Sequence, residues 1–307
     1  MRIAILGSGG VGGYFGGRLA VGGDVDVHFI ARGAHLDTMK RNGLRIESPS
    51  GDVQLAKVNA TDDPATIGPV DLVLFTVKLY DNESAIGLLP PLIGPKTLVV
   101  PFQNGVDTID QLTHAVGRAH VAGGTTYVVS VVGEPGVIKH TALNSLVFGP
   151  LAGEPPASLV ELRDAGKRAG IDTILSEKIQ LDIWTKFVRL SSFSGITAML
   201  RSAIGPIRDD PEYRAMLESA VHEAIAVARA RHVFLPHDTF PRVMAALDAL
   251  PSESKSSMLQ DLERGKRLEL PWLSGAVVRI GREVGVRAPT HEQFVRTLRL
   301  HQYGKPH

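Results

Sequence analysis

Short apolar runs recur along the first half of the chain and predict strands buried in a parallel sheet. The run at 71–77 reads Asp-Leu-Val-Leu-Phe-Thr-Val, which is typical of a strand covered on both faces, and 97–101 repeats the pattern. Helical patterns separate such runs, as at 34–42 and 157–169. Strands that alternate with helices predict a doubly wound α/β domain. Further strands are expected at 25–31, 44–47, 53–58, 121–132, 136–140, 145–149 and 171–175.

The first apolar run ends in a glycine-rich turn with the spacing Gly-x-Gly-x-x-Gly, and a helical pattern follows at once. In this context Gly7 makes a tight turn, Gly9 lets backbone approach a pyrophosphate, and Gly12 lets the helix pack closely on the strand. A flexible loop is the alternative for a glycine triplet alone. The flanking strand and helix favour a dinucleotide site at the helix N-terminus. Its candidate residues are Gly7, Ser8, Gly9, Gly10, Val11 and Gly12.

The second strand run ends in Arg32, where enzymes that prefer NAD carry an Asp or Glu for the ribose hydroxyl. A guanidinium can donate two parallel hydrogen bonds to the oxygens of one phosphate, so Arg32 favours a cofactor with a 2′-phosphate. The alternative is a solvated charge at a strand end. We expect NADPH as the cofactor in preference to NADH.

The pattern changes beyond residue 175. Long helical patterns follow, broken at glycine and proline positions, and no further strand run stands out. A chain of 307 residues has room for two domains. We therefore expect a Rossmann-type α/β domain at 1–175 and an all-α domain at 176–307.

Composition narrows the classes of function. Hydrophobic residues make up 44% of the chain and the formal net charge is +1, which gives no reason to expect nucleic acid or an anionic membrane as a partner. The absence of cysteine excludes disulfides and thiolate chemistry and fits a cytoplasmic enzyme. No apolar stretch approaches the roughly 18 residues of a membrane-spanning helix. The 11 histidines lack ligand spacing, so we expect no metal site.

Two polar residues follow the expected strands at 71–77 and 97–101, at the sheet edge where ligands bind in such folds. Lys78 is placed to approach cofactor phosphate or ribose, with a surface lysine as the alternative. Asn104 precedes Gly105, and it either hydrogen-bonds a carbonyl or the cofactor or simply forms a turn.

The helical half holds a lysine and a carboxylate with two interpretations each. At 100° per residue, Lys186 falls among apolar positions, apart from a polar stripe of Asp182, Thr185, Arg189 and Ser192. Such a lysine either extends its ammonium to solvent or is semi-buried with a lowered pKa, as a proton donor would be. Glu269 precedes a helix and either complements its dipole or orients a lysine or a substrate hydroxyl.

These segments, in this order, resemble the ketopantoate reductase family (2-dehydropantoate 2-reductases) over essentially the whole chain. The segments that carry the resemblance are 7–20, 31–33, 76–78, 103–106, 184–187 and 256–261. The resemblance implies that NADPH delivers hydride to C2 of a 2-oxo acid, with 2-dehydropantoate as the leading substrate in pantothenate biosynthesis. It also implies an active site between the two domains. Family habit is the main support for a homodimer.

The resemblance also assigns roles. Lys186 is similar to the general acid, Glu269 to the acidic residue near that lysine and the substrate hydroxyl, and Arg32 to the partner of the 2′-phosphate. Asn104 and Ser257 match polar contacts to cofactor and substrate. Two positions depart from the family, because Leu190 and Ser194 stand where it usually carries asparagines for the substrate's polar groups.

Loss of such hydrogen-bond partners can change specificity by about 10⁴-fold. A second interpretation is therefore a related reductase of a more apolar 2-oxo acid, ketone or imine. A third is an NADPH-binding protein without turnover, against which the retained Lys186, Asn104, Ser257 and Glu269 argue.

Overall fold

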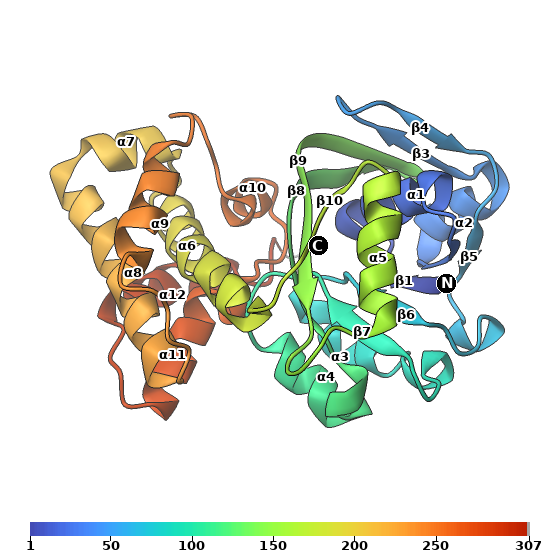
Figure 1. Ribbon diagram of the computed structural model, residues 1–307. Coiled ribbons are helices and arrows are strands. Elements are labelled where there is room, and N and C mark those ends of the chain that lie inside the picture. The colour runs from blue at the N-terminus through green and yellow to red at the C-terminus, as the bar shows by residue number, and fades with distance from the viewer. Residues whose placement is uncertain (306–307) are drawn as a thin grey trace. The chain divides into compact units, whose positions relative to one another are not determined.

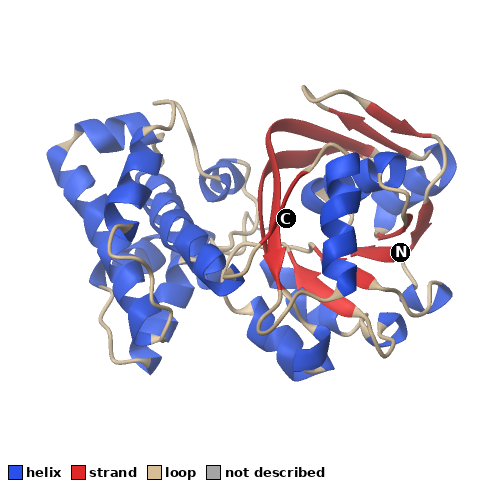
Figure 2. Ribbon diagram, in the orientation of Figure 1, coloured by secondary structure: helices blue, strands red, loops and turns tan. Residues whose placement is uncertain are grey.

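The computed structural model describes residues 1–305, and the chain divides into two compact units (Figure 1). The first unit comprises Met1–Gln103 and Thr108–Ile179. The second unit comprises the short segment Asn104–Asp107 and the chain from Gln180 onward. The α/β architecture of the first and the helical architecture of the second confirm the predicted fold class (Figure 2).

A five-stranded parallel sheet with the order β5-β2-β1-β6-β7 forms the centre of the first unit. Alternate residues of β1 enter different cores: Ile3 and Ile5 pack with α1, whereas Ala4 and Leu6 pack with side chains of α3 and α4. Helices therefore cover both faces, as doubly wound folds require. The strands are β1 (Arg2–Leu6), β2 (Asp26–Ile30), β5 (Asn59–Thr61), β6 (Leu72–Phe75) and β7 (Leu98–Pro101).

The helices of this unit are short, and the dinucleotide-motif helix α1 is the first of them. They are α1 (Gly10–Gly22), α2 (Gly33–Asn42), α3 (Asn82–Ile86), α4 (Thr108–Val116) and α5 (Ala157–Arg168). Single 3₁₀ turns lie between them at η1 (Pro64–Thr66), η2 (Leu79–Asp81), η3 (Pro90–Leu92) and η4 (Arg118–His120).

A second sheet, which the sequence patterns do not predict as such, has the order β10-β9-β3-β4, with β8 paired to β9. The two runs expected at 136–140 and 145–149 are one strand, β9, which pairs with β8 through an irregular antiparallel register. The run expected at 53–58 ends as a strand at Leu55. The strands are β3 (Leu44–Glu47), β4 (Val53–Leu55), β8 (Gly123–Glu134), β9 (Val137–Gly149) and β10 (Asp172–Leu175).

Glycines let α1 pack tightly between the two sheets. A Cβ on Gly12 or Gly16 would lie 2.8 Å from Ile5 of the first sheet. On the other side of the helix, a Cβ on Gly13 would lie 2.7 Å from Ile138, and one on Gly17 would lie 2.6 Å from Ile46. Real Cβ atoms do not approach so closely, so paired glycines are what bring this helix against both sheets.

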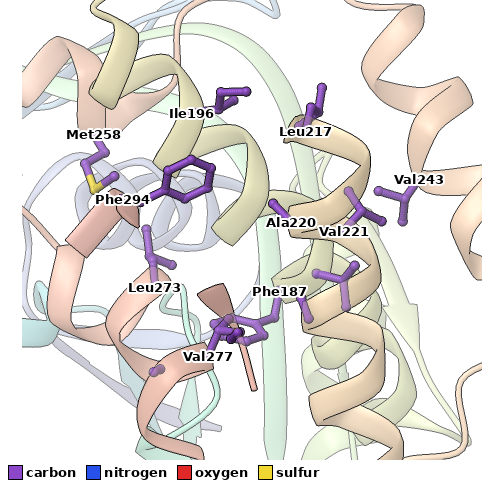
Figure 3. Close-up of a cluster of buried hydrophobic side chains, with 14 of the residues drawn as sticks. Phe187, Ile196, Leu217, Ala220, Val221, Val243, Met258, Leu273, Val277 and Phe294 are labelled. Carbon is purple, nitrogen blue, oxygen red and sulfur yellow. The ribbon is translucent and has the colours of Figure 1, made fainter. Parts of the chain in front are cut away.

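The second unit contains helices and 3₁₀ turns but no strand among the described residues. Its core is formed by apolar side chains from all seven of the α-helices given below, and part of it is drawn in Figure 3. Phe187 and Ile196 come from α6, and Phe294 comes from α12. The helices are α6 (Ile179–Leu200), α7 (Ile204–Asp209), α8 (Pro211–Ala230), α9 (Thr239–Asp248), α10 (Ser257–Glu263), α11 (Ser274–Glu283) and α12 (Pro289–Leu298), with turns η5 (Leu270–Trp272) and η6 (Arg299–His301).

Within residues 1–305, none of the helices combines the length and apolarity that a bilayer crossing needs.

Candidate functional site

The predicted site residues fall into two sets, one in each unit. The first set is the glycine turn with Arg32 and Lys78. The second contains Lys186, Glu269 and also Asn104, because the segment Asn104–Asp107 belongs to the second unit.

The glycine turn is anchored to the end of β2. The backbone N–H groups of Gly7 and Ser8 both donate to the carbonyl of Ile30, at 3.3 and 3.1 Å, and the Ser8 hydroxyl donates to the same oxygen at 3.1 Å. Gly7 has a φ of +104°, and a Cβ there would lie 2.7 Å from the backbone nitrogen of Val77. This position therefore accepts only glycine without strain.

The N-terminus of α1 is open in the way that a pyrophosphate site requires. Gly9 is the N-cap residue and supplies no side-chain cap, and a Cβ there would meet nothing within 4 Å. On the neighbouring Gly10, a Cβ would lie 2.3 Å from the carbonyl oxygen of Ser130. The first N–H groups of a helix have no partner within it, so Gly10, Val11 and Gly12 present amides and a positive dipole end to an anion.

Two cations stand at the same carboxyl edge of the parallel sheet. Arg32 is the N-cap residue of α2, its side chain is 68% exposed, and its guanidinium lies 3.7 Å from the Asp81 carboxylate. So loose and exposed an ion pair contributes little stability, and a phosphate can compete for the guanidinium. Lys78 is exposed at the start of η2.

Lys186 belongs to α6, and the residue is only 9% exposed. Burial lowers the pKa of its ammonium to about 7, and the charge of Arg189 also lowers it, whereas the carboxylate of Glu269 raises it. A buried ammonium fits the interpretation of Lys186 as a functional group better than that of a lysine extended into solvent.

Glu269 is buried and pairs with Asn104, whose Nδ2 donates to its Oε2 at 3.3 Å. It is the residue before η5, yet its side chain makes no capping hydrogen bond. The observed contact therefore favours an orienting role over complementing a helix dipole. The segment that carries Asn104 is fixed by Val106, which packs on the helical core, and by Asp107, which accepts two 2.7 Å hydrogen bonds from Arg279.

Further positions on α6 continue from the lysine along one side of the helix. Leu190 follows Lys186 by four residues and packs partly buried against the core. Ser194, eight residues on, is fully buried, and its hydroxyl has no hydrogen-bond partner within residues 1–305. Thr197 hydrogen-bonds Ser256 through their hydroxyl groups at 2.7 Å. An unpartnered buried hydroxyl costs free energy, so Ser194 is a candidate to bind a substrate group.

The structure corrects one assignment, that of Ser192, while the predicted contact of Ser257 to cofactor and substrate stays a prediction. Ser192, assigned to a polar stripe, is fully buried and its hydroxyl donates to the Val188 carbonyl at 3.0 Å. Ser257 is exposed as the first residue of α10, while Ser256 is buried and caps the helix by accepting from the Leu259 N–H at 3.1 Å. A serine directly before an apolar helical run is the usual N-cap signal, so this signal could have identified Ser256.

A buried ammonium costs stability below its pKa, which gives a test of this site. Below pH about 7 the lysine is charged in both states, and the folded state carries the full cost of burial. Between that value and 10.5 the unfolded chain binds more protons, so stability rises with pH and the cost disappears. Lys186→Met is therefore expected to be more stable than the wild type at low pH, with an advantage that shrinks as pH rises.

The measurement is urea unfolding of both proteins between about pH 6 and 10, where each tenfold change in the protonation equilibrium is worth about 1.4 kcal/mol. A difference in stability that does not depend on pH would contradict the burial of a titrating ammonium.

The relatives of this chain define its class, the oxidoreductases that act on CH–OH groups. The chain belongs to the ketopantoate reductase PanE/ApbA family, whose models match residues 3–153 and, for the C-terminal part, 178–302. The predicted family and enzyme class are thus confirmed.

Relatives align over nearly their whole length. The 2-dehydropantoate 2-reductase of Mesorhizobium japonicum is 31% identical over 97% of each chain. A protein of Bacillus subtilis, named uncharacterized oxidoreductase YkpB, is 30% identical over 99% of this chain and 100% of its own. The crystal structure of a PanE/ApbA family ketopantoate reductase from Ralstonia eutropha JMP134 has a TM-score of 0.89 and 32% identity, covering 98% of each chain.

Proposed function

We propose that the chain is an NADPH-dependent reductase that converts a 2-oxo acid into a 2-hydroxy acid, with 2-dehydropantoate as the leading substrate. The observation that carries the proposal is the buried Lys186. Burial lowers the pKa of its ammonium to about 7, and the opposing charge of Glu269, whose carboxylate accepts a hydrogen bond from Asn104, raises it. Relatives named 2-dehydropantoate 2-reductase support the substrate class.

The first unit has the chemistry that NADPH requires. The amides of the glycine turn and of the first turn of α1 fit a pyrophosphate, and exposed Arg32 fits a 2′-phosphate with Lys78 on the neighbouring loop. When bound, NADPH supplies the hydride that reduces the substrate. We assign Asn104 a contact to cofactor and substrate in addition to its bond with Glu269.

The second unit supplies the proton. As hydride reaches C2, negative charge builds on the carbonyl oxygen, and the Lys186 ammonium stabilises this charge and transfers a proton from Nζ to it. The product is an alcohol, and the lysine is left neutral until it regains a proton from solvent. Glu269 raises the pKa of the lysine against the larger effect of burial, and it offers an acceptor to a substrate hydroxyl.

The assignment of Lys186 as the acid predicts a pH profile. Because the lysine must be protonated, kcat/KM for reduction is expected to be highest below pH 7 and to fall by about tenfold per pH unit well above it. Glu269→Gln removes the charge that raises the pKa of Lys186, so the fall moves to lower pH. Rate profiles of both proteins test this, and an unmoved or upward-shifted fall in the variant would contradict it.

Leu190 favours a second candidate, a reductase of a more apolar substrate. Leu190 offers no hydrogen bond four residues after the lysine, and Ser194 offers only a hydroxyl. Oxidation of NADPH with 2-dehydropantoate, branched 2-oxo acids and simple ketones separates the candidates. Turnover of 2-dehydropantoate supports the first, and turnover of apolar substrates alone supports the second. The cytoplasmic location and the homodimer stay predictions.

A further inference from the structure

Three segments of the first unit meet at the side chain of His35, in the first turn of α2. Its Nε2 lies 2.9 Å from the carbonyl oxygen of Ser8 in the glycine turn. Its Nδ1 accepts a hydrogen bond from the backbone N–H of Gly136, in the turn between β8 and β9, at 3.0 Å. One imidazole thus connects the dinucleotide motif to a hairpin about a hundred residues further along the chain.

The two bonds fix the tautomer of the ring. A nitrogen that accepts from an N–H group carries no hydrogen, so the proton of the neutral imidazole is on Nε2 and is donated to Ser8. Half-burial lowers the pKa of His35, which favours this neutral form. The ring therefore donates on one side and accepts on the other, and both partners are backbone groups.

The far end of this connection is itself held in place. Gly136 has a φ of +78°, and a Cβ there would lie 2.6 Å from Thr38, so the hairpin turn lies directly against α2. The carbonyl of Gly136 accepts from the Arg45 N–H of β3 at 2.9 Å. His35 is thus attached to a fixed point of the second sheet, not to a free loop.

The bond between His35 and the Ser8 carbonyl sets the orientation of the Ser8–Gly9 peptide group in the glycine turn. The N–H and the hydroxyl of Ser8 are bound to Ile30, which leaves its carbonyl to be fixed by His35. In a trans peptide the carbonyl and the following N–H point in opposite directions. Because the Ser8 carbonyl is directed at the imidazole ring, the Gly9 N–H points away from that ring. The space next to Gly9 is free, since a Cβ there would meet no atom within 4 Å.

We propose that His35 is a positioning residue for the cofactor, which holds the Ser8–Gly9 peptide so that the Gly9 amide faces the pyrophosphate. The inference rests on the proposed dinucleotide-binding function. Its consequence is specific: loss of the bond to Ser8 weakens the binding of ligands that contain the pyrophosphate and leaves the recognition of the 2′-phosphate unchanged.

Two substitutions separate the two bonds of the ring. The amide nitrogen of a glutamine reaches the place of Nε2, so His35→Gln keeps a donor for Ser8. The oxygen of an asparagine reaches the place of Nδ1, so His35→Asn keeps only the acceptor for Gly136. His35→Ala removes both, and His114→Gln, at an exposed histidine of α4, is the matched control.

The measurements are the Kd of NADPH and of 2′-AMP, which lacks the pyrophosphate, together with kcat and the KM for NADPH. We expect the Kd and KM of NADPH to rise about tenfold in His35→Ala and His35→Asn, with His35→Gln close to the wild type. Little change is expected in kcat or in the Kd of 2′-AMP.

An unchanged Kd of NADPH in His35→Ala would overturn the proposal. Equal losses for NADPH and 2′-AMP would also overturn it, because they would show a general loss of structure. A wild-type protein that binds no NADPH would instead refute the proposed function, and it is measured before any variant.

Discussion

Lys186→Ala is expected to lower kcat for reduction by about 10² to 10⁴-fold while NADPH binds as before. The variant loses the only group in the proposed mechanism that donates a proton to the developing alkoxide. The glycine turn and Arg32, which the proposal assigns to cofactor binding, are unchanged in this variant, so the Kd of the cofactor is expected to change little. Steady-state rates and a fluorescence titration with NADPH measure the two effects separately.

Lys178→Ala, at an exposed lysine just before α6, is the control and should keep wild-type turnover. Full activity in Lys186→Ala would show that another group protonates the substrate. If the wild type shows no turnover with any 2-oxo acid, ketone or imine but binds NADPH, the interpretation as a non-catalytic binding protein gains support.

Arg32→Ala is expected to raise the KM for NADPH by about 10- to 100-fold and to leave the KM for NADH nearly unchanged. A charge-assisted hydrogen bond contributes about 1.5 to 3 kcal/mol, and only the 2′-phosphate of NADPH would receive it from Arg32. The exposed ion pair with Asp81 costs little to break, so the guanidinium is available to a phosphate. The measurement is kcat/KM with each cofactor.

Arg41→Ala, at an exposed arginine of the same helix, controls for a general loss of positive charge. Equal losses with NADPH and NADH in Arg32→Ala would contradict recognition of the 2′-phosphate. Equal efficiency of the wild type with both cofactors would refute the preference itself.

The sequence predicts the parts of the fold that depend on local pattern. The buried runs of β6 and β7 and the glycine turn before α1 lie where the apolar pattern and glycine spacing indicate. The second sheet could not be predicted in the same way, since β3 pairs with β9 across about ninety residues. The residue pattern of a strand does not show which other strand it pairs with.

The candidate site shows the same limit. The position of Lys186 in an apolar helix face leaves two interpretations open, extension to solvent or burial, and only the folded structure shows that it is buried. Glu269 is brought near it by tertiary packing. Nothing local to Asn104 indicates that it belongs with the helical unit, because its partner Glu269 is 165 residues away. His35 was not identified from the sequence for a similar reason, since both of its partners are backbone groups of other segments.

The segment Asn104–Asp107 means that the helical unit is not one continuous piece of chain. A fragment that begins at Gln180 would leave Glu269 without its amide partner and Arg279 without the carboxylate of Asp107. In folding, these contacts close loops of 165 and 172 residues, after helices and hairpins have formed from nearer neighbours. The entropic cost of closing a loop grows only by about 0.6 kcal/mol for each doubling of its length. These contacts are therefore expected to form slowly during folding, yet their long loops reduce the stability of the folded state only slightly.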